Sequence, residues 1–338
     1  MDIILNPDFE AHAGQGEFHQ GKFVPCFENP SRVKNIVAAL RERGAEFIDP
    51  EDHGIDPVLA VHDADYVDFL RTIHDEWLAQ GNEGDVMPYL WPVPGLRYLQ
   101  HENLNAKIGS YAFSSDTPIM AGTWTSAYQG AQTALTAVAR ADGGAFALTR
   151  PPGHHAHAGI YGGYCYLNNS AIAAQAAIDG GRARVCVLDV DFHHGNGTQD
   201  IFYDREDVLT VSLHGDPKTS FPYFLGYADE TGEGDGEGAN LNLPMPAGTD
   251  FATWSQSLHA ALDRIGEHGS ELVVVALGVD TFEGDPISSF AIKTPDYLEM
   301  GRRIAGLGLP TVFVMEGGYD VGPIGENVAN VLEGFAQF

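Results

Sequence analysis

The stretch VLDVDFHHGNG, residues 187–197, is an apolar run that ends in alternating polar side chains and then turns at glycines. Together with the apolar residues before it, this run predicts a strand over residues 185–190 that is buried on both faces, as in a parallel sheet. Side chains two positions apart on an extended chain share one face. Asp189, Asp191 and His193 are therefore expected to point the same way at the end of that strand, as ligands for a metal ion or a proton.

Similar apolar runs alternate with helical patterns through most of the chain, which predicts βα units and a mostly parallel sheet with helices on both faces. Further strands are expected at residues 3–5, 145–148, 208–213, 272–277 and 311–315. Helices are expected at residues 31–43, 64–76, 123–139, 168–178, 251–267, 295–305 and 325–338. We find no internal repeat and no linker between two cores, so a single α/β domain over residues 1–338 is expected.

The composition limits the classes of function. With 44% hydrophobic residues among 338, the chain can bury a large core, and it contains neither an apolar run as long as a membrane span nor a basic, apolar leader. A formal net charge of -29 argues against a nucleic-acid partner, because a polyanion would be repelled. We therefore expect a cytoplasmic protein whose partners include neither nucleic acid nor a membrane. The acidity has two interpretations: attraction of a cationic substrate, or a surface suited to a saline habitat.

The three cysteines, Cys26, Cys165 and Cys186, form no CxxC pair, so neither a disulfide framework nor a thiolate zinc site is indicated. Any metal ion must be held by His, Asp or Glu. Cys165 stands beside aromatic residues at the start of a helix and is expected to be a packed small side chain.

Two long irregular stretches interrupt the alternation, at residues 81–105 and 214–239, and both are rich in aromatic residues. Such loops often form the rim of a binding site or a subunit contact, although a plain surface excursion is the alternative. The run GEGDGEG inside the second is expected to be a flexible loop, because it follows no strong strand and opens no helix.

Four of the expected strands are followed by segments rich in polar residues and glycine: RPPGHHAHAGIYGGY, DFHHGNG, GVDTFEGD and EGGYD. In open parallel sheets, sites lie beyond the carboxyl ends of the strands, where the following loops meet. Side chains far apart in the sequence are therefore expected to converge there: His154, His155, Asp189, Asp191, His193, Asp280, Glu316 and Tyr319.

Asp191, His193 and Asp280 form a plausible metal-binding set, because one imidazole and two carboxylates leave a zinc ion with an open position for water or substrate. The set is rich in oxygen, so ferrous iron or cobalt also suits it. Asp189 is expected one layer behind the ligands, accepting a hydrogen bond from an imidazole and fixing its tautomer.

Three further side chains suit proton transfer and charge stabilisation. His154 and His155 follow a Pro-Pro-Gly turn whose restricted backbone can hold them rigidly. Tyr319 follows two glycines and could donate a hydrogen bond to a developing oxyanion. His194, on the opposite side of the extended chain from His193, is expected to be structural, and His157 receives no role.

Along nearly its whole length the sequence resembles the histone deacetylase superfamily, on the arginase/deacetylase fold. The segments that carry the resemblance are RPPGHHA, GGYCYLNN, VLDVDFHHGNGTQDIFY, VSLHGDP, GVDTFEGDP and MEGGY. Within the superfamily the chain is most similar to the bacterial acetylpolyamine amidohydrolases, which share SLHGDP, FLGYADETG, LGVDTFEGDPIS and an inserted loop at about residues 81–105. A single deacetylase domain with that inserted loop is the implied architecture.

The resemblance implies roles for individual residues. Asp191, His193 and Asp280 become the zinc ligands, His154 and His155 the tandem histidines, and Tyr319 the catalytic tyrosine. Asp189 matches the carboxylate behind His154, whereas Asn196 stands behind His155 where some members have a second aspartate. An amide there leaves His155 less basic, which suits a residue that acts first as base and then as acid.

The resemblance also implies substrate contacts and a second ion. Tyr164 and Phe221 match an aromatic pair that walls a narrow tunnel, and Gly163 is expected to contact the substrate beside them. Some polyamine-cleaving relatives are expected to carry two acidic residues that face the distal ammonium group of the substrate. Their counterparts here are Asn105 and Asp116, so only one of the two positions is acidic in this chain. A structural potassium or sodium ion is implied at a site formed by Asp189, Asp191, His193, Ser212 and Leu213.

The implied function is a zinc-dependent amidohydrolase that removes acetyl groups from small cationic acetylated amines, with acetylpolyamines or acetyldiamines as the first expectation. A protein acetyl-lysine deacetylase is the alternative within the superfamily. A homodimer joined through the inserted loop would exclude folded protein substrates from the tunnels. A binuclear manganese ureohydrolase would need bridging carboxylates, but the position two beyond Asp280 is Phe282. A non-catalytic metal-binding protein is the remaining alternative.

Overall fold

The computed structural model describes residues 1–93 and 103–337. Its centre is a seven-stranded sheet in which all neighbouring strands are parallel. In spatial order the strands are β1 (Asp2–Leu5), β4 (Ala145–Leu148), β9 (Thr311–Met315), β8 (Leu272–Leu277), β5 (Val185–Asp189), β6 (Val208–Gly215) and β7 (Asn240–Met245). Six of these strands confirm the expectation from the apolar runs, and the parallel pairing confirms the α/β fold class.

Alternate side chains of the central strands enter two separate cores, because the side-chain period of a strand is two. On β5, Val185 and Val187 belong to one hydrophobic cluster, while Cys186 and Leu188 belong to the other. β8, β9 and β4 divide in the same way. Burial on both faces explains why these strands read as continuous apolar runs in the sequence.

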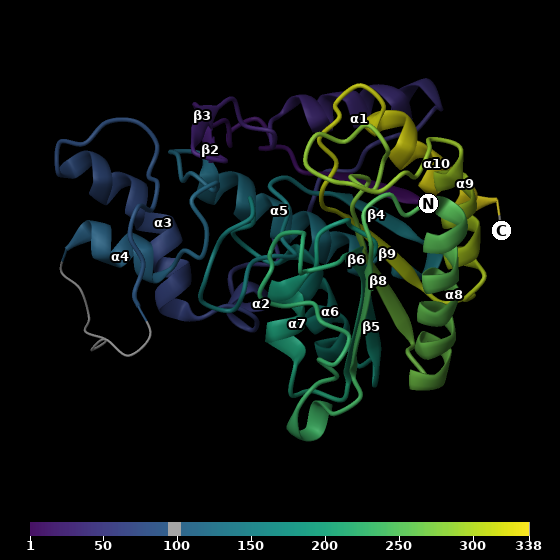
Figure 1. The fold of residues 1–338 in the computed structure, drawn as a ribbon. Coiled ribbons are helices and arrows are strands. Elements are labelled where there is room, and N and C mark those ends of the chain that lie inside the picture. Colours follow the sequence, from purple (N-terminus) through teal and green to yellow (C-terminus); the bar gives the residue numbers. More distant parts are fainter. Residues whose placement is uncertain (94–102, 338) are drawn as a thin grey trace.

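The helices cover both faces of the sheet (Figure 1). On one face lie α5 (Thr123–Val138) and α6 (Asn169–Asp179), and α3 (Ala64–Ala79) packs farther from the sheet in the same hydrophobic cluster. On the other lie α1 (Ser31–Glu42), α8 (Phe251–His268), α9 (Asp296–Ala305) and α10 (Ile324–Ala336). These seven confirm the helices expected from the sequence to within about three residues at each end. Shorter helices complete the fold: α2 (Asp56–Leu59), α4 (Leu104–Ser110) and α7 (Asn196–Phe202).

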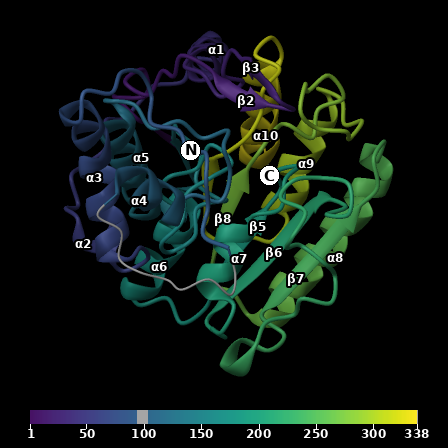
Figure 2. The ribbon, with the colours of Figure 1, turned by 60° about the vertical axis from the view of Figure 1, so that its left-hand side comes forward.

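The sequence interpretation missed β7 and a small antiparallel hairpin of β2 (Glu17–His19) and β3 (Lys22–Val24). β7 is the edge strand beside α8 (Figure 2), and its residues NLNLPM carry asparagines and a proline where the inner strands carry valine and leucine. An edge strand tolerates proline and polar residues because it pairs on one side only. The hairpin is too short for a period-two pattern to stand out from a loop.

The two long loops are only partly irregular. Residues 94–102 of the inserted loop lie outside the described residues, and α4 begins just after them at Leu104. In the second loop, the run GEGDGEG, expected to be flexible, contains a 3-10 turn at Gly234–Gly236. Among the helices of residues 1–93 and 103–337, none combines the length and the apolar character needed to cross a bilayer.

Candidate active site

The polar residues that follow β4, β5, β8 and β9 meet at the carboxyl edge of the sheet, as the parallel topology predicts. Register places Asp189 beside Ala276 and Leu277 beside Met315, so the loops after these strands start at similar heights. A cavity of about 460 Å³ opens above them. Seven of the expected site residues line it: Asp116, His155, Gly163, Tyr164, His193, Phe221 and Tyr319.

Asp191, His193 and Asp280 form a compact group of buried ligands, with their donor atoms all within 4.8 Å of one another. Nδ1 of His193 lies 2.9 Å from Oδ2 of Asp280 and 3.3 Å from Oδ1 of Asp191. Asp191 and His193 lie in the loop after β5, and Asp280 in the loop after β8. The structure therefore brings together the three residues that the sequence analysis selected as metal ligands.

This donor set fits a divalent cation. Two carboxylates buried next to each other repel and are poorly solvated, so they need a compensating positive charge. Gly317 gives the ligands room: its N–H donates to Oδ2 of Asp191 at 2.8 Å, and a Cβ there would lie 2.5 Å from that oxygen and 2.8 Å from Oδ2 of Asp280. Two carboxylates and an imidazole nitrogen are a zinc-type donor set.

His154 and His155 lie side by side, with ring centroids 4.0 Å apart, but have different partners. Nδ1 of His154 lies 2.9 Å from Oδ2 of Asp189, and Nδ1 of His155 lies 2.6 Å from Oδ1 of Asn196. Burial alone would lower the pKa of His154, but the charges of Asp189 and Asp191 outweigh it and raise that pKa to about 10. Burial, together with the charged His154 ring, holds the pKa of His155 well below its ordinary value. One imidazole is therefore cationic and the other neutral at pH 7.

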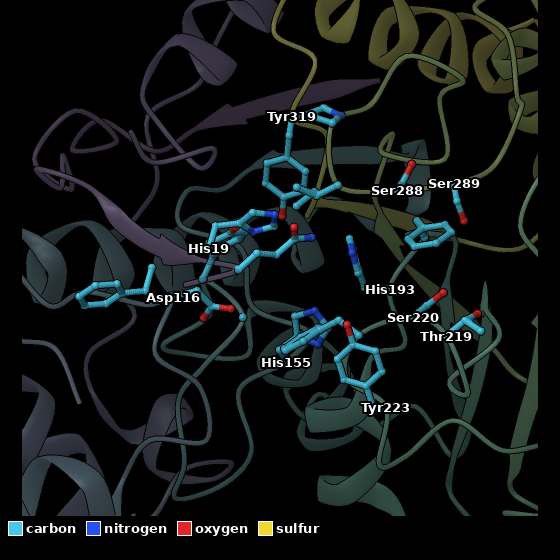
Figure 3. Close-up of a pocket in the computed structure, with 18 residues that line it drawn as sticks. His19, Asp116, His155, His193, Thr219, Ser220, Tyr223, Ser288, Ser289 and Tyr319 are labelled. Atoms are coloured by element: carbon cyan, nitrogen blue, oxygen red, sulfur yellow. The ribbon is translucent and has the colours of Figure 1, made fainter. Parts of the chain in front are cut away.

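Tyr319 points into the same space as His155 and His193 (Figure 3). Burial raises the pKa of its phenol well above the ordinary value, so it stays a hydrogen-bond donor. Two contacts position Tyr319. Its backbone N–H donates to Oδ2 of Asp285 at 2.7 Å, and the guanidinium of Arg32 lies 4.9 Å from the centroid of its ring. Asp285 and Arg32 were not expected from the sequence, because each acts from a distant segment.

The aromatic wall residues also lie on the cavity. Tyr164 has a left-handed backbone, φ 67°, and its N–H and OH are both tied, to Thr117 and to Glu17. Gly163, with φ 55°, packs so closely that a Cβ would lie 2.5 Å from Cδ2 of His155. The Phe221 ring meets the His155 ring edge-on, with centroids 5.1 Å apart.

Of the two positions matched to distal acids, only Asp116 lies on the cavity. Its Oδ1 accepts hydrogen bonds from the hydroxyls of Ser114 and Thr117, at 2.6 and 2.7 Å. Asn105 is in α4 and is not among the residues that line the cavity. Of the two positions that the resemblance matches to acidic residues facing the distal ammonium, one therefore offers a carboxylate to the cavity in the described part of the chain.

Several expected residues lie behind the cavity. Glu316 is buried and accepts hydrogen bonds from the N–H groups of Gly153 and His154, so it supports the histidine loop. Asp189 and Ser212 stand opposite each other on β5 and β6 and border a small cavity of about 10 Å³. The other residues assigned to a monovalent cation, Asp191, His193 and Leu213, are not among the residues that line it. His194 shares its Nε2 with Gln199 and Asn242 in the interior, as expected of a structural residue.

Other lining residues were missed by the sequence analysis. The β2–β3 hairpin contributes Phe18, His19 and Gln20 to the rim, and Figure 3 labels His19 there. Phe192 also lines the wall. The glycine of the Gln20-Gly21 turn is a turn signal, but strands of three residues on either side are too short to identify a hairpin from it. Cys165 is buried, and its thiol lies 3.3 Å from the carbonyl of Gly163, which confirms a packing role.

Comparisons with known proteins identify the family of the chain. Residues 26–335 match the family model of the histone deacetylase domain. Acetylpolyamine amidohydrolase 2 of Pseudomonas aeruginosa is 50% identical over 99% of this chain and 98% of that protein. The acetylpolyamine amidohydrolase of Mycoplana ramosa is 47% identical over 99% of this chain and 100% of that protein. The crystal structure of an acetylpolyamine aminohydrolase from Burkholderia pseudomallei aligns with a TM-score of 0.94 and 39% identity, over 99% of this chain and 98% of that chain. The chain therefore belongs to the histone deacetylase family, whose members are deacetylase-type hydrolases.

Proposed function

We propose that this protein is a zinc-dependent amidohydrolase that removes acetyl groups from N-acetylated aliphatic amines, with acetylpolyamines and acetyldiamines as its substrates. The observation that carries the proposal is that one cavity brings four kinds of group together. It is lined by His193 of the metal-binding set, the neutral imidazole of His155, the phenol of Tyr319 and the carboxylate of Asp116. The names of the similar proteins, acetylpolyamine amidohydrolases, support the same substrate class.

Asp191, His193 and Asp280 would hold the metal ion, for which ferrous iron or cobalt is an alternative to zinc. When bound, such an ion polarises a carbonyl oxygen and lowers the pKa of water. A structural potassium or sodium ion would lie near Asp189 and Ser212, which pair on β5 and β6. Of the other residues assigned to it, Asp191 and His193 come just after β5, and Leu213 follows Ser212 on β6.

The chain's own residues divide the remaining chemistry. His155, neutral and with Nδ1 tied to Asn196, takes a proton from the attacking water at its other nitrogen, Nε2, and returns it to the departing amine. Tyr319 donates its hydroxyl hydrogen to the acetyl oxygen as negative charge develops there. His154, cationic beside Asp189, favours the same negative charge through its field.

Asp116 would receive the distal ammonium of the substrate. Two hydroxyl donors fix one of its oxygens, which leaves the other carboxylate oxygen for a cation. A net charge of -29 adds attraction at long range for cationic molecules. Both features favour an acetylated diamine or polyamine over an uncharged amide.

Rival activities lack this support. A binuclear manganese site needs an additional carboxylate beside the first metal ion, but Phe282 packs against the hydrophobic cluster of α8 and α9. A non-catalytic metal-binding protein would not need a neutral imidazole and a phenol on the same cavity. It would be favoured if metal-loaded protein released acetate from none of the amines below.

The test compares kcat/KM on acetylputrescine, acetylcadaverine, acetylspermidine and an acetyl-lysine peptide, with uncharged N-acetylbutylamine as the reference. We expect the cationic acetyl-amines to be the best substrates. Asp116→Asn should raise KM for acetylputrescine about tenfold, about 1.4 kcal/mol, and leave KM for N-acetylbutylamine unchanged. Asp263→Asn, on the exposed face of α8, is the matched control for the loss of one negative charge. A higher kcat/KM on the peptide would instead favour the protein deacetylase.

A homodimer joined through the inserted loop and a cytoplasmic location complete the proposal. Exposed apolar side chains lie in the described part of the loop, with Tyr89 69% and Val93 58% exposed, as a subunit contact would require. Three unpaired cysteines suit a reducing compartment. Light scattering on the purified protein tests the assembly, and a monomer at working concentration would contradict it.

A further inference from the structure

His155 is the first of four side chains that are hydrogen-bonded in series from the cavity to the protein surface. Its Nδ1 lies 2.6 Å from Oδ1 of Asn196, and Nδ2 of Asn196 lies 2.8 Å from Nε2 of His157. Nδ1 of His157 lies 2.9 Å from Oδ2 of Asp200, whose side chain is 54% exposed. We call these four residues the His155–Asp200 chain.

The α7 helix creates this arrangement. Asn196 and Asp200 are four residues apart on α7, so their side chains lie on the same face of the helix. His157 spans that face and contacts both. The backbone of the histidine loop is docked onto the start of α7, because the N–H groups of Gly197 and Thr198 both donate to the carbonyl of His154. The contact is therefore fixed from both sides.

The orientation of the Asn196 amide sets the direction of every hydrogen bond in the chain. Its NH2 group faces Nε2 of His157 and can only donate, so Nε2 accepts and the hydrogen of the His157 ring is on Nδ1, where Oδ2 of Asp200 accepts it. The oxygen of the amide faces Nδ1 of His155. The oxygen in turn requires the hydrogen of His155 to be on Nδ1, which leaves Nε2 of His155 with its lone pair.

We propose that His157 and Asp200 are positioning residues for His155, and that they act through the amide of Asn196 to hold His155 in the tautomer able to accept a proton. This inference rests on the proposed function, in which His155 is the general base. If the amide of Asn196 turned over, its NH2 group would face Nδ1 of His155, and the hydrogen would move to Nε2, where a proton must be accepted. His157 is not among the residues that line the cavity, so it acts through its neighbour.

A contribution to stability alone does not account for the arrangement. A polar contact with a partner as exposed as Asp200 contributes little to folding. An asparagine beside His155 needs a second partner for its NH2 group to have a fixed orientation, because its two ends are similar in shape. His157 provides that partner, and it is an acceptor.

The test uses three substitutions that differ in what they offer to Asn196. His157→Gln keeps an acceptor, His157→Ala removes it, and His157→Lys offers only donors. We expect kcat close to that of the wild type for His157→Gln, a loss of roughly tenfold for His157→Ala, as for other residues that orient a catalytic group, and a larger loss for His157→Lys. KM for the acetylated amine and the bound metal should be the same in all three.

His259→Ala is the matched control, because it removes an exposed histidine, 3.6 Å from Asp263 on α8, that is not among the residues that line the cavity. It should leave kcat unchanged. If kcat follows the melting temperature of the variants and not their acceptor character, or if His157→Lys retains the kcat of His157→Gln, the proposal is wrong.

A second readout does not depend on activity. In protein with 15N-labelled histidine, NMR should report His155, assigned by its loss in His155→Ala, as the Nδ1–H tautomer in the wild type and the Nε2–H tautomer in His157→Lys. An unchanged tautomer would overturn the inference even in an active enzyme. A wild type that hydrolyses none of the acetylated amines would instead contradict the proposed function, while the NMR result would still decide the role of His157.

Discussion

The adjacent imidazoles of His154 and His155 differ in the group behind each Nδ1 atom. Asp189 is a carboxylate and Asn196 is an amide, although both bind their histidine at under 3 Å. The carboxylate stabilises a cation, whereas the amide stabilises a tautomer without adding charge. In the proposed mechanism, this difference gives His154 an electrostatic role and His155 the role of proton transfer.

Asp189→Asn should change the alkaline limb of the pH profile. In the wild type the pKa of His154 is raised to about 10, so His154 stays cationic up to that pH. Removing the carboxylate lowers the pKa of His154, and activity that depends on its charge should then fall at a lower pH. The measurement is kcat against pH from 6 to 10 for both proteins. An alkaline limb at the same pH in both would contradict the role given to His154.

Tyr319→Phe should lower kcat by about two orders of magnitude or more, since it removes one donor to the developing oxyanion. The ring contacts with Tyr164 and Arg32 remain, so the melting temperature and the metal content should not change. Steady-state kinetics and thermal unfolding of the same preparation check both statements. Near-normal turnover would remove Tyr319 from the mechanism.

At the scale of the element, the sheet could be predicted from the sequence because burial on both faces leaves an unmistakable apolar run. The six strands of this kind were located, and the ligands at their ends followed from topology. β7 and the β2–β3 hairpin could not be found in this way, because β7 carries asparagines and a proline and each hairpin strand has only three residues. The contacts of Asp285, Arg32 and His157 depend on which loops meet in space, which a single sequence does not encode locally.

The loop after β9 gives a prediction at this scale. Gly317→Ala should release the metal ion and abolish activity, since the added Cβ would lie 2.5 and 2.8 Å from the oxygens of two ligands. Gly266→Ala, in α8 with no atom within 4 Å of the new Cβ, is the control and should stabilise the protein by about 0.5 to 1 kcal/mol. Metal content per chain and thermal unfolding are the measurements. A Gly317→Ala protein that retains its metal ion would contradict the close approach described here.

Across the whole molecule, buried histidines tie stability to pH. His62 is buried between two backbone groups: its Nε2 accepts from the N–H of Asn168 at 2.9 Å, and its Nδ1 lies 3.2 Å from the carbonyl of Ala158. Burial lowers its pKa to about 4. Burial likewise lowers the pKa of His214 to about 4 and that of His12 to about 3. At a pH between the folded-state pKa of each histidine and its unfolded pKa of 6.5, the histidine binds fewer protons in the folded protein than in the unfolded chain.

For such a group the stabilisation is fully present above pH 6.5 and is lost as the pH falls toward the folded pKa. His62→Gln keeps an acceptor but does not titrate. Between pH 6.5 and 4, the free energy of unfolding of the wild type should fall relative to that of the variant by about 3 kcal/mol, at about 1.4 kcal/mol per pH unit. Urea unfolding of both proteins at several pH values measures the difference. Parallel curves would show that His62 titrates normally in the folded protein.

The central claim is that Asp191, His193 and Asp280 hold a single divalent ion on which hydrolysis depends. The direct measurement is acetate release from acetylputrescine by protein that has been chelated exhaustively and then titrated with zinc, with the metal content of the same samples determined by plasma emission. The account predicts loss of activity on chelation and full recovery at one zinc ion per chain. Full activity after complete removal of metal, or recovery that requires two ions per chain, would contradict it.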